Sequence, residues 1–346
     1  MIHSGGVVRF TNLILENWRN FTHVEGALAR RVIVTGPNAS GKSNLLDALR
    51  FLREVASGGG LQQAVRRRGG MARLRCLAVP AAAQVALEVR VAADEGGPEW
   101  EYELRFAEDA KRRPVVARER VSAGGRDILV RPDALDRDDP QRLLATALEQ
   151  VHSNREFREL AEFLASVREV ENAGGAELAA AIAALPENAA ASRLRRILDL
   201  VRPLVAQLEA LDFHRDARGT PHLRARFGYS HGAWQREEQL SSGTLRMIAL
   251  LWAALDGSGP LLAEEPERSL GPAAAREILP MLRAATRRTE RQTFLATHSR
   301  AIVEEESVLP EEVLLLEPGE DGTTARTPSP FAAPVDEEQL ALFGDA

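Results

Sequence analysis

The first part of the chain contains short segments in which apolar and polar residues alternate, the pattern of β-strands with one solvent-facing side. Such segments lie at 84–92, 99–106 and 115–121, and two short segments before them, at 7–10 and 13–16, also look like strands. A continuous apolar run at Val32–Val34 and a helical repeat over residues 43–55 separate the early segments from the later ones. The pattern therefore predicts a β-rich lobe, partly an antiparallel meander, that is interrupted by one helix.

The middle of the chain changes to helical spacing. From about Pro140 to Leu211, apolar residues recur every three or four positions, with interruptions at 172–175 and at Pro186. The segment lacks the sustained heptads of a long coiled coil, so we predict a helical insertion. Beyond it, strands and helices alternate, which favours a parallel sheet with crossover helices. The expected elements are strands at 223–227, 261–263 and 292–296 and helices at 244–255 and 273–287.

Composition places the chain among ordinary globular proteins. Its 346 residues, 45% of them hydrophobic, are enough for a substantial core in one large or two medium domains. No apolar stretch approaches the roughly 18 residues of a membrane span, and the N-terminus lacks the pattern of an export signal. Cys76 is the only cysteine, which excludes an internal disulfide or a four-cysteine zinc site and predicts a small core residue. We therefore expect a cytoplasmic protein without a membrane partner.

The net charge of −6 is concentrated near the end of the sequence. Residues 317–346 contain seven acidic residues and one arginine, which is also −6, so the preceding residues balance to zero. We predict that this acidic, proline-rich tail is mostly disordered, with a docking role for 340–343 as the alternative to a plain solvating tail. Residues 58–75, rich in glycine and arginine, are predicted to be an exposed, mobile connection. A neutral body argues against binding nucleic acid by bulk charge and leaves local arginine patches.

A glycine-rich loop joins the apolar run at 32–34 to the first helix. Its residues match G-x-x-x-x-G-K-[ST] at every fixed position: Gly36, Pro37, Asn38, Ala39, Ser40, Gly41, Lys42 and Ser43. In such a loop, backbone N–H groups converge on phosphate oxygens, the helix presents its positive dipole end, and the lysine adds a point charge. Ser43 is then placed to ligate Mg²⁺. Lys42 is one of only two lysines in a chain whose other basic residues are arginine, which weighs against a chance glycine turn.

Two segments of the second half carry further candidate chemistry. The apolar strand at 261–263 delivers Glu264 and Glu265 to its carboxyl end, where ligands of open α/β sheets collect. An acidic pair before a proline is often a solvated turn, but hydrolysis of Mg²⁺–ATP needs one acid near the metal and another to deprotonate the attacking water. Ser241, Ser242 and Gly243 begin an apolar helix. They fit an N-cap and also an anion site for a phosphate bound by a partner molecule.

A histidine ends the last predicted core strand. His298 directly follows the apolar strand and Thr297. A lone histidine is usually structural, but at the end of a strand in the same sheet it can donate a hydrogen bond to a γ-phosphate. His298 is therefore a further candidate residue.

The order of these motifs resembles the SMC/RecF/ABC class of P-loop ATPases, most closely the stand-alone AAA-type ATPases related to RecF and to the ATPase part of OLD-family nucleases. The resemblance covers about residues 7–316. It implies an α/β fold, a P-loop NTPase with an ABC/SMC-type head, in which a mixed sheet has an antiparallel β part and a parallel α/β core, and a helical insertion. The implied domains are an N-terminal lobe at 1–135, the insertion at 136–215, a C-terminal lobe at 216–316 and the tail at 317–346.

The resemblance also implies roles for individual residues. The implied nucleotide ligands are the Walker A loop, Gly36–Ser43, with Asn44 and, from a second subunit, the signature residues Ser241, Ser242 and Gly243. The implied metal ligands are Ser43 and Glu264. The implied catalytic residues are Lys42, Glu265 as the general base, and His298. Residues 269–272 correspond to the D-loop.

Several positions depart from the family pattern. Glu264 stands where the family has aspartate, which leaves direct or water-mediated contact with Mg²⁺ open. Ser242 replaces the first glycine of the signature, and Gly271 replaces the residue that usually precedes the D-loop proline. Gln62 and Gln63 are weak candidates for the glutamine of the Q-loop. Only 48 residues follow His298, without an acidic cluster on strands, so any nuclease would be a separate chain.

We therefore expect an ATPase that forms a head-to-tail homodimer around ATP and Mg²⁺. Its expected setting is DNA repair or anti-phage defence, with DNA or a separately encoded nuclease as the partner. A nucleotide-gated interaction module with slow hydrolysis is the first alternative. The second is the ATPase subunit of a membrane transporter, against which the long insertion and the Leu-Ser-Ser-Gly-Thr sequence at 240–244 count.

Overall fold

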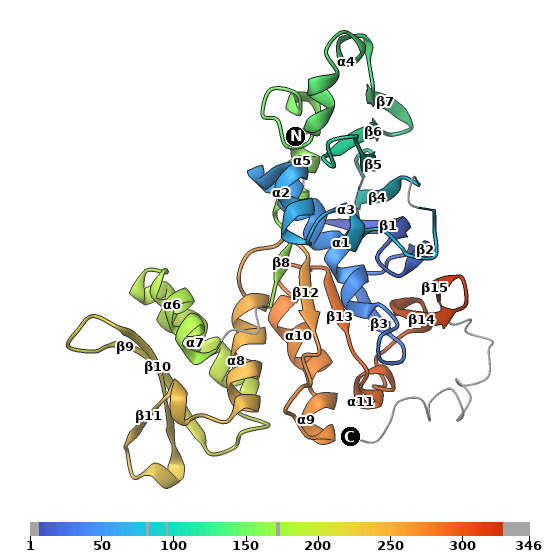
Figure 1. The fold of residues 1–346 in the computed structure, drawn as a ribbon. Helices are drawn as coiled ribbons and strands as arrows, with labels where there is room; N and C mark the ends of the chain where they lie inside the picture. The colour runs from blue at the N-terminus through green and yellow to red at the C-terminus, as the bar shows by residue number, and fades with distance from the viewer. Residues whose placement is uncertain (1–6, 81–82, 95, 171–173, 328–346) are drawn as a thin grey trace. The chain divides into compact units, whose positions relative to one another are not determined.

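The computed structural model describes residues 7–80, 83–94, 96–170 and 174–327 (Figure 1). The chain divides into two compact units. The first contains the residues up to Val167, Arg291–His298 and the residues from Ser307 onward, and the second contains Arg168–Glu290 and Ser299–Glu306. The segment predicted as a helical insertion at 136–215 contributes to both units, and the predicted domain boundaries stay predictions.

An antiparallel sheet of six strands forms the β part of the first unit. In order of pairing, the strands are β2 (Phe21–Ala27), β1 (Val8–Trp18), β4 (Val85–Ala93), β5 (Trp100–Glu108), β6 (Pro114–Ala123) and β7 (Arg126–Arg131). Residues of β5 alternate between buried and partly exposed, as the sequence pattern requires of a sheet with one covered face. The predicted meander is confirmed, and β7 adds a strand to it. The segments predicted at 7–10 and 13–16 are one strand with an irregularity between Phe10 and Asn12.

The parallel part of the first unit carries the glycine loop. Its strands, in order of pairing, are β15 (Gly322–Arg326), β14 (Val313–Gly319), β3 (Arg31–Thr35) and β13 (Thr293–Ala296). β3 pairs in parallel with both β13 and β14, and β14 pairs antiparallel with β15. The apolar residues of β3 and β13 are at most 2% exposed, the continuous burial typical of parallel strands. The carboxyl ends of β3 and β13 therefore lie side by side.

Helical structure continues from the glycine loop through the segment that was predicted to be mobile. It consists of α1 (Lys42–Glu54), a kinked turn (Val55–Gly59), α2 (Gly60–Arg67) and α3 (Met71–Leu74). Arg68 is 9% exposed and donates to the carboxylates of Asp47 and Glu54 at 2.8 and 2.9 Å. These ion pairs fasten the turn between α2 and α3 to α1. The prediction of an exposed, mobile connection over 58–75 is wrong, because two carboxylates compensate the burial of this arginine.

The predicted tail begins as ordered sheet. β14 continues to Gly319, and β15 contains Thr323, which is 3% exposed. The prediction of disorder is therefore wrong for residues 317–326, where the antiparallel pairing of β14 with β15 and the burial of Thr323 outweigh the acidic composition. Residues 328–346, with the docking segment proposed at 340–343, lie outside the described residues.

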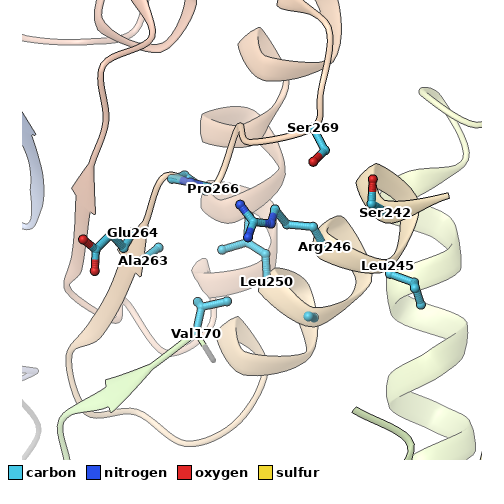
Figure 2. Close-up of a pocket in the computed structure, with 10 residues that line it drawn as sticks. Val170, Ser242, Leu245, Arg246, Leu250, Ala263, Glu264, Pro266 and Ser269 are labelled. Carbon is cyan, nitrogen blue, oxygen red and sulfur yellow. The ribbon is translucent and has the colours of Figure 1, made fainter. Parts of the chain in front are cut away.

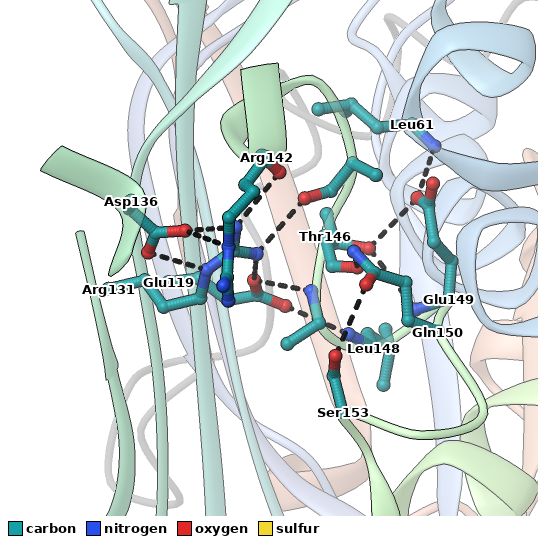
Figure 3. Close-up of polar contacts among 12 residues, drawn as sticks. Leu61, Glu119, Arg131, Asp136, Arg142, Thr146, Leu148, Glu149, Gln150 and Ser153 are labelled. Carbon is teal, nitrogen blue, oxygen red and sulfur yellow. Dashed lines mark hydrogen bonds and ion pairs between the residues drawn. The ribbon is translucent and has the colours of Figure 1, made fainter. Parts of the chain in front are cut away.

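A buried ion-pair network fastens the segment after β7 to the antiparallel sheet (Figure 3). Glu119 on β6 accepts hydrogen bonds from the backbone N–H groups of Ala147 and Leu148 at 2.7 and 3.1 Å and from Arg131 at 3.0 Å. Arg131 also pairs with Asp136 at 2.9 Å and uses all five of its N–H donors. The hydrogen bond from Arg131 lowers the pKa of Asp136 to about 2, whereas burial raises the pKa of Glu119.

The same segment reaches back to the helices that follow the loop. It contains α4 (Ala134–Asp138), 3₁₀ turns at Pro140–Leu144 and Arg155–Phe157, and α5 (Arg158–Ala165). Glu149 accepts a hydrogen bond of 2.8 Å from the N–H of Leu61 in the first turn of α2. The side-chain amide of Gln62 donates to the carbonyls of Pro114 and Leu144, both at 2.7 Å. Gln62 is therefore a packing residue here, which argues against its assignment to a Q-loop.

The second unit combines helices with two small groups of strands. Its elements are β8 (Arg168–Glu169), α6 (Gly175–Ala183), α7 (Glu187–Val201), β9 (Leu208–Arg215), β10 (Pro221–Phe227), β11 (Trp234–Arg236), α8 (Ser242–Ala254), β12 (Leu261–Glu264), α9 (Pro272–Arg276), α10 (Ile278–Thr286) and α11 (Arg300–Val303). α7 packs against α8 and α10, and α6 and α7 cover the antiparallel sheet β11–β10–β9 (Figure 1). β8 and β12 pair in parallel.

Most elements predicted for this unit are confirmed. The strands at 223–227 and 261–263 and the helix at 244–255 correspond to β10, β12 and α8. The helix predicted over 273–287 is divided at Glu277 into α9 and α10. The strands β9 and β11 were not predicted, because β9 lies at the end of a region with helical spacing and β11 has only three residues.

Candidate nucleotide-binding site

The loop Gly36–Ser43 leaves the buried end of β3 and enters α1. Gly36 and Gly41 have φ of 149° and 100°, and Ala39 has φ of 64°. A Cβ atom on Gly36 would lie 2.5 Å from the carbonyl oxygen of Leu316, and one on Gly41 would lie 2.4 Å from the side-chain nitrogen of Asn20. Both glycines of the motif are therefore required by the backbone conformation and by the neighbours of the loop.

The start of α1 presents backbone donors. Within the described residues, α1 has no side-chain cap at Gly41 and no acidic residue in its first turn. The first N–H groups of a helix lack intrahelical partners, and the helix dipole favours an anion beside them. Ser40 is fully buried, and its hydroxyl has no hydrogen-bond partner among the described residues. An uncapped helix start and an unsatisfied buried hydroxyl in one loop fit the phosphate chain of a nucleotide.

Lys42 is folded back over the loop. Its ammonium donates to the carbonyl oxygens of Gly36 and Pro37 at 2.8 and 2.9 Å, and the residue is 8% exposed. Ser43, the next residue, is exposed. The loop thus carries one positive charge close to its own backbone and a solvent-accessible serine beside it.

The turn between β1 and β2 supports the loop through Asn20 and Trp18. The side-chain nitrogen of Asn20 donates to the carbonyl of Ser40 at 2.9 Å and to the hydroxyl of Thr323 at 2.8 Å, and its side-chain oxygen accepts from Asn44 at 2.8 Å. The buried indole of Trp18 donates to the carbonyl of Asn44 at 2.8 Å. Asn44, a predicted nucleotide ligand, therefore links α1 to this turn.

Sequence reasoning missed the supporting role of this turn. Asn17 and Arg19 have φ of 54° and 56°, an uncommon conformation for residues other than glycine. Asn17 is buried, and its side chain accepts from the N–H of Cys76 at 2.9 Å and donates to the carbonyl of Ala83 at 3.0 Å. Cys76 is 2% exposed, as predicted. The sequence signal for this role was the pair of asparagines on either side of Trp-Arg between two strands. Asparagine tolerates a left-handed backbone, and its side-chain amide can both donate and accept hydrogen bonds.

His298 lies at the same edge of the parallel strands as the loop. Ala296 is in register with Val34, and the N–H of Thr297 donates to the carbonyl of Val34 at 3.0 Å. His298 comes next and is exposed, just as the loop begins two residues after Val34. The first unit therefore brings the predicted phosphate loop and the predicted switch histidine to one edge.

The acidic pair lies at the end of β12 in the second unit. Glu264 is the last residue of the strand, and Glu265 follows it with a φ of 43°. The guanidinium of Arg246 on α8 donates to the backbone carbonyl of Glu265 at 2.9 Å. Figure 2 shows the carboxylate of Glu264 on the opposite side of β12 from Arg246. Both glutamates are partly exposed, so their carboxylates remain accessible to water.

The predicted signature residues form the first turn of α8. Ser241 is the N-cap, and its hydroxyl accepts from the N–H of Thr244 at 3.1 Å, which confirms the N-cap interpretation. Ser241 and Ser242 are exposed. Gly243 is buried, and a Cβ atom there would lie 2.8 Å from the carbonyl oxygen of Ser269. The turn therefore packs closely on the loop that follows the acidic pair.

A cavity of about 160 Å³ lies between α8, the end of β12 and the following loop (Figure 2). Its lining includes Ser242, Arg246, Glu264 and Ser269. The predicted site residues thus fall into two groups. The loop and His298 belong to the first unit, and the acidic pair and the signature turn belong to the second.

Within the part of the chain that the structure describes, every helix falls short of the apolar length that a bilayer span requires. No curated protein matches the sequence. Solved structures do match, and all those named here are SMC heads. The SMC head domain from Thermotoga maritima is 14% identical, with a TM-score of 0.51, over 93% of this chain and 99% of that chain.

Two further SMC heads each have a TM-score of 0.58 over 93% of this chain. One, an SMC head bound to the C-terminal winged-helix domain of ScpA, is 14% identical and is covered over 98% of its length. The other is the SMC head with an extended coiled coil bound to the C-terminal domain of ScpA derived from Pyrococcus furiosus, 12% identical and 96% covered. At these identities the likeness establishes the fold, a mixed α/β head of the SMC type.

A family model covers residues 31–304, which include every predicted site residue. Its description is "AAA domain, putative AbiEii toxin, Type IV TA system". The match extends over most of the chain, and the loop, the acidic pair and the SMC-type fold agree with it. The chain therefore belongs to this AAA family, and its fold is similar to that of SMC heads.

Proposed function

We propose that the protein binds and hydrolyses ATP together with Mg²⁺. The observation that carries the proposal is the loop at Gly36–Ser43, where two sterically required glycines, an uncapped helix start and a buried ammonium meet. These features suit the phosphate chain of a nucleotide, because the backbone N–H groups at the helix start and the ammonium of Lys42 can donate to anionic oxygens.

Each site residue has a defined task in this proposal. When bound, ATP and Mg²⁺ supply the scissile phosphoanhydride and a cation that offsets the developing charge. Lys42 exchanges the carbonyls of Gly36 and Pro37 for phosphate oxygens. Ser43 and Glu264 would hold the metal, Glu265 orients and deprotonates the attacking water, and His298 donates a hydrogen bond to the γ-phosphate.

In the same proposal, a second copy of the chain completes the site. Ser241 and Ser242 are exposed at the start of α8, a helix of 13 residues. The first N–H groups of such a helix lack intrahelical partners, and here Ser241 caps that of Thr244 and leaves the others for an anion. The loop around Lys42 in one subunit would face Ser241–Gly243 of the other, with ATP between them. The homodimer then forms only while nucleotide is bound.

Calorimetry with Mg²⁺–ATP tests nucleotide binding. The Lys42→Ala variant should lose the heat of association, because it removes the charge that faces the phosphates. The chain offers a matched control in Lys111, its only other lysine, which lies exposed between β5 and β6. Lys111→Ala should bind ATP like the wild type. Loss of binding in both variants, or in neither, would contradict the assignment of the loop.

Turnover and assembly test the catalytic assignment. Glu265→Gln should keep nucleotide binding, slow hydrolysis by roughly 10² or more, and accumulate an ATP-bound dimer in light-scattering chromatography. Glu238→Gln, at an exposed position of the same unit, is the matched control and should behave like the wild type. Wild-type turnover by the Glu265→Gln protein would refute the assignment.

An arginine surface supports a nucleic-acid partner. Residues 55–87 contain five arginines and no aspartate or glutamate. Arg66, Arg67 and Arg73 are exposed on α2 and α3, while the buried Arg68 fixes these helices to α1. Phosphate contacts of this kind give salt-dependent binding without sequence preference. The proposed setting is anti-phage defence or DNA repair, with a separately encoded nuclease as a further partner, and the toxin named in the family description favours defence.

Measuring ATP turnover with and without duplex DNA separates the two candidate functions. Strong stimulation that is lost when Arg66, Arg67 and Arg73 are all changed to alanine supports an ATPase acting on DNA. No stimulation, together with slow hydrolysis, supports a nucleotide-gated interaction module. The SMC heads bound to ScpA make such a module a specific alternative, since those heads bind another protein.

A further inference from the structure

Arg246 links α8, the helix that begins with the predicted signature residues, to the backbone of Glu265. Its guanidinium donates to the carbonyl oxygen of Glu265 at 2.9 Å. The same carbonyl accepts the backbone N–H of Arg268 at 3.0 Å, so Glu265 begins a tight turn. Glu265 itself has a φ of 43°, a conformation that costs a side-chain-bearing residue energy unless its surroundings enforce it. Two hydrogen bonds to one carbonyl are contacts that can enforce it.

A second contact joins the same two segments closer to the start of the helix. Gly243 lies in the first turn of α8, and a Cβ atom there would lie 2.8 Å from both the carbonyl oxygen of Ser269 and the side chain of Leu270. Ser269 also has a positive φ, of 69°. The first turn of α8 therefore cannot shift toward the loop at 265–270 without moving it.

We propose that Arg246 is a positioning residue that couples the first turn of α8 to the aim of the Glu265 carboxylate. The inference rests on the proposed function, in which Glu265 is the general base. When the nucleotide held by a second copy contacts Ser241–Gly243 through its phosphate, α8 is displaced. Arg246 transmits this displacement to the carbonyl of Glu265. The carboxylate then reaches its productive orientation only when both copies hold the nucleotide.

The surroundings of Arg246 suit this task. The side chain lies between α8 and the loop after β12 and lines the cavity there (Figure 2). Burial and the neighbouring Arg268 lower the pKa of Arg246, while Glu265 and Glu267 act in the opposite direction. A guanidinium keeps its charge in proteins, so the hydrogen bond to the carbonyl is charge-assisted. Its planar, rigid donors also fix direction, which a flexible ammonium does less well.

The test compares Arg246→Ala and Arg246→Lys with a matched arginine. Arg268→Ala is the control, because Arg268 is exposed nearby and contacts the Glu265 carbonyl only through its backbone N–H, which alanine retains. ATP turnover is measured under single-turnover conditions, ATP affinity by calorimetry, and folding by thermal unfolding. Each Arg246 variant is also made in the Glu265→Gln background.

Arg246→Ala should lower the hydrolysis rate about 10- to 100-fold, the range of a charge-assisted hydrogen bond, while ATP affinity stays within about twofold. Arg246→Lys should recover part of the rate, and Arg268→Ala should retain it. In the Glu265→Gln background, the Arg246 substitutions should cause no further loss, because Arg246 acts through Glu265. If Arg246→Ala does not fold, Arg246→Lys alone carries the same comparison.

Two results would overturn the inference. One is wild-type turnover by Arg246→Ala. The other is an equally large drop in the hydrolysis rate when Arg246 is replaced in the Glu265→Gln background, which would indicate a merely structural role. Failure of the proposed function gives a different result, because the wild-type protein itself would then hydrolyse no ATP. The inference about Arg246 would then also be refuted.

Discussion

Replacing Gly41 by alanine should destabilise the protein through two separable costs. The first is backbone strain, because Gly41 has a φ of 100° and a Cβ atom there costs about 1–2 kcal/mol. The second is displacement of Asn20, whose side-chain nitrogen and oxygen would lie 2.4 and 2.5 Å from that Cβ. Asn20 makes three hydrogen bonds, to Ser40, Thr323 and Asn44, each contributing about 1 kcal/mol. The total loss in the free energy of unfolding is about 4–5 kcal/mol.

A double-mutant cycle with Asn20→Ala separates the two costs. Asn20→Ala alone should lower the free energy of unfolding by about 3 kcal/mol, since it removes all three hydrogen bonds. In that background, Gly41→Ala has no amide left to displace and should cost only the strain, about 1–2 kcal/mol. The two substitutions should therefore be coupled by about 3 kcal/mol. Urea unfolding without nucleotide, followed by tryptophan fluorescence, measures each corner of the cycle.

Additive effects of Gly41→Ala and Asn20→Ala on the free energy of unfolding would contradict this coupling. Coupling below about 0.5 kcal/mol is the level found for distant, independent sites. It would mean that the amide of Asn20 moves aside at no cost and that the loop is not held by the β1–β2 turn. A glycine at position 20 serves as a second probe, because it removes the amide together with the rest of the side chain.

Three more predictions concern the buried ion pairs. Glu119→Ala leaves the guanidinium of Arg131 buried with a lost partner and should lower the free energy of unfolding by about 3–5 kcal/mol in urea titrations, whereas an alanine at the exposed Glu320 should change it little. Because the folded pKa of Asp136 is about 2 against 3.8 unperturbed, its ionised form should stabilise the fold by roughly 2–3 kcal/mol above pH 4. That contribution should disappear as the pH falls from about 4 to about 2, and Asp136→Asn should flatten this part of a stability–pH profile; an unchanged slope would contradict it. Arg68→Ala should release α2 and α3, so amide hydrogen exchange over residues 60–75 should accelerate relative to α1, and equal protection in both proteins would count against the anchoring role.

Periodicity predicted those elements whose burial follows from a single local pattern. β3 and β13 are continuous apolar runs, and both are buried parallel strands. The loop between β3 and α1 was predicted from its spacing because the motif needs particular residues at particular positions. The relation of His298 to this loop followed from the rule that parallel strands share a carboxyl edge.

Other features depend on partners that are distant in the sequence. The charge of Arg68 is compensated by Asp47 and Glu54 on another helix, so a glycine- and arginine-rich composition was misleading. β15 is stabilised by its pairing with β14 and by contacts with the β1–β2 turn, which its own polar residues do not reveal. Asn20 supports the loop only because the strand order places it there. Local propensity is outweighed in each case by tertiary contacts.

The hairpin of β14 and β15 has a consequence for biosynthesis. The carbonyl of Leu316 abuts Gly36, and the hydroxyl and N–H of Thr323 bond to the side chain and carbonyl of Asn20 at 2.8 and 2.9 Å. A ribosome completes Lys42 long before it reaches these residues, so the nascent phosphate loop lacks its bracing for most of elongation. Under the proposed function, nascent chains stalled before residue 313 should accordingly be unable to retain ATP, which would keep half-made copies from joining finished ones.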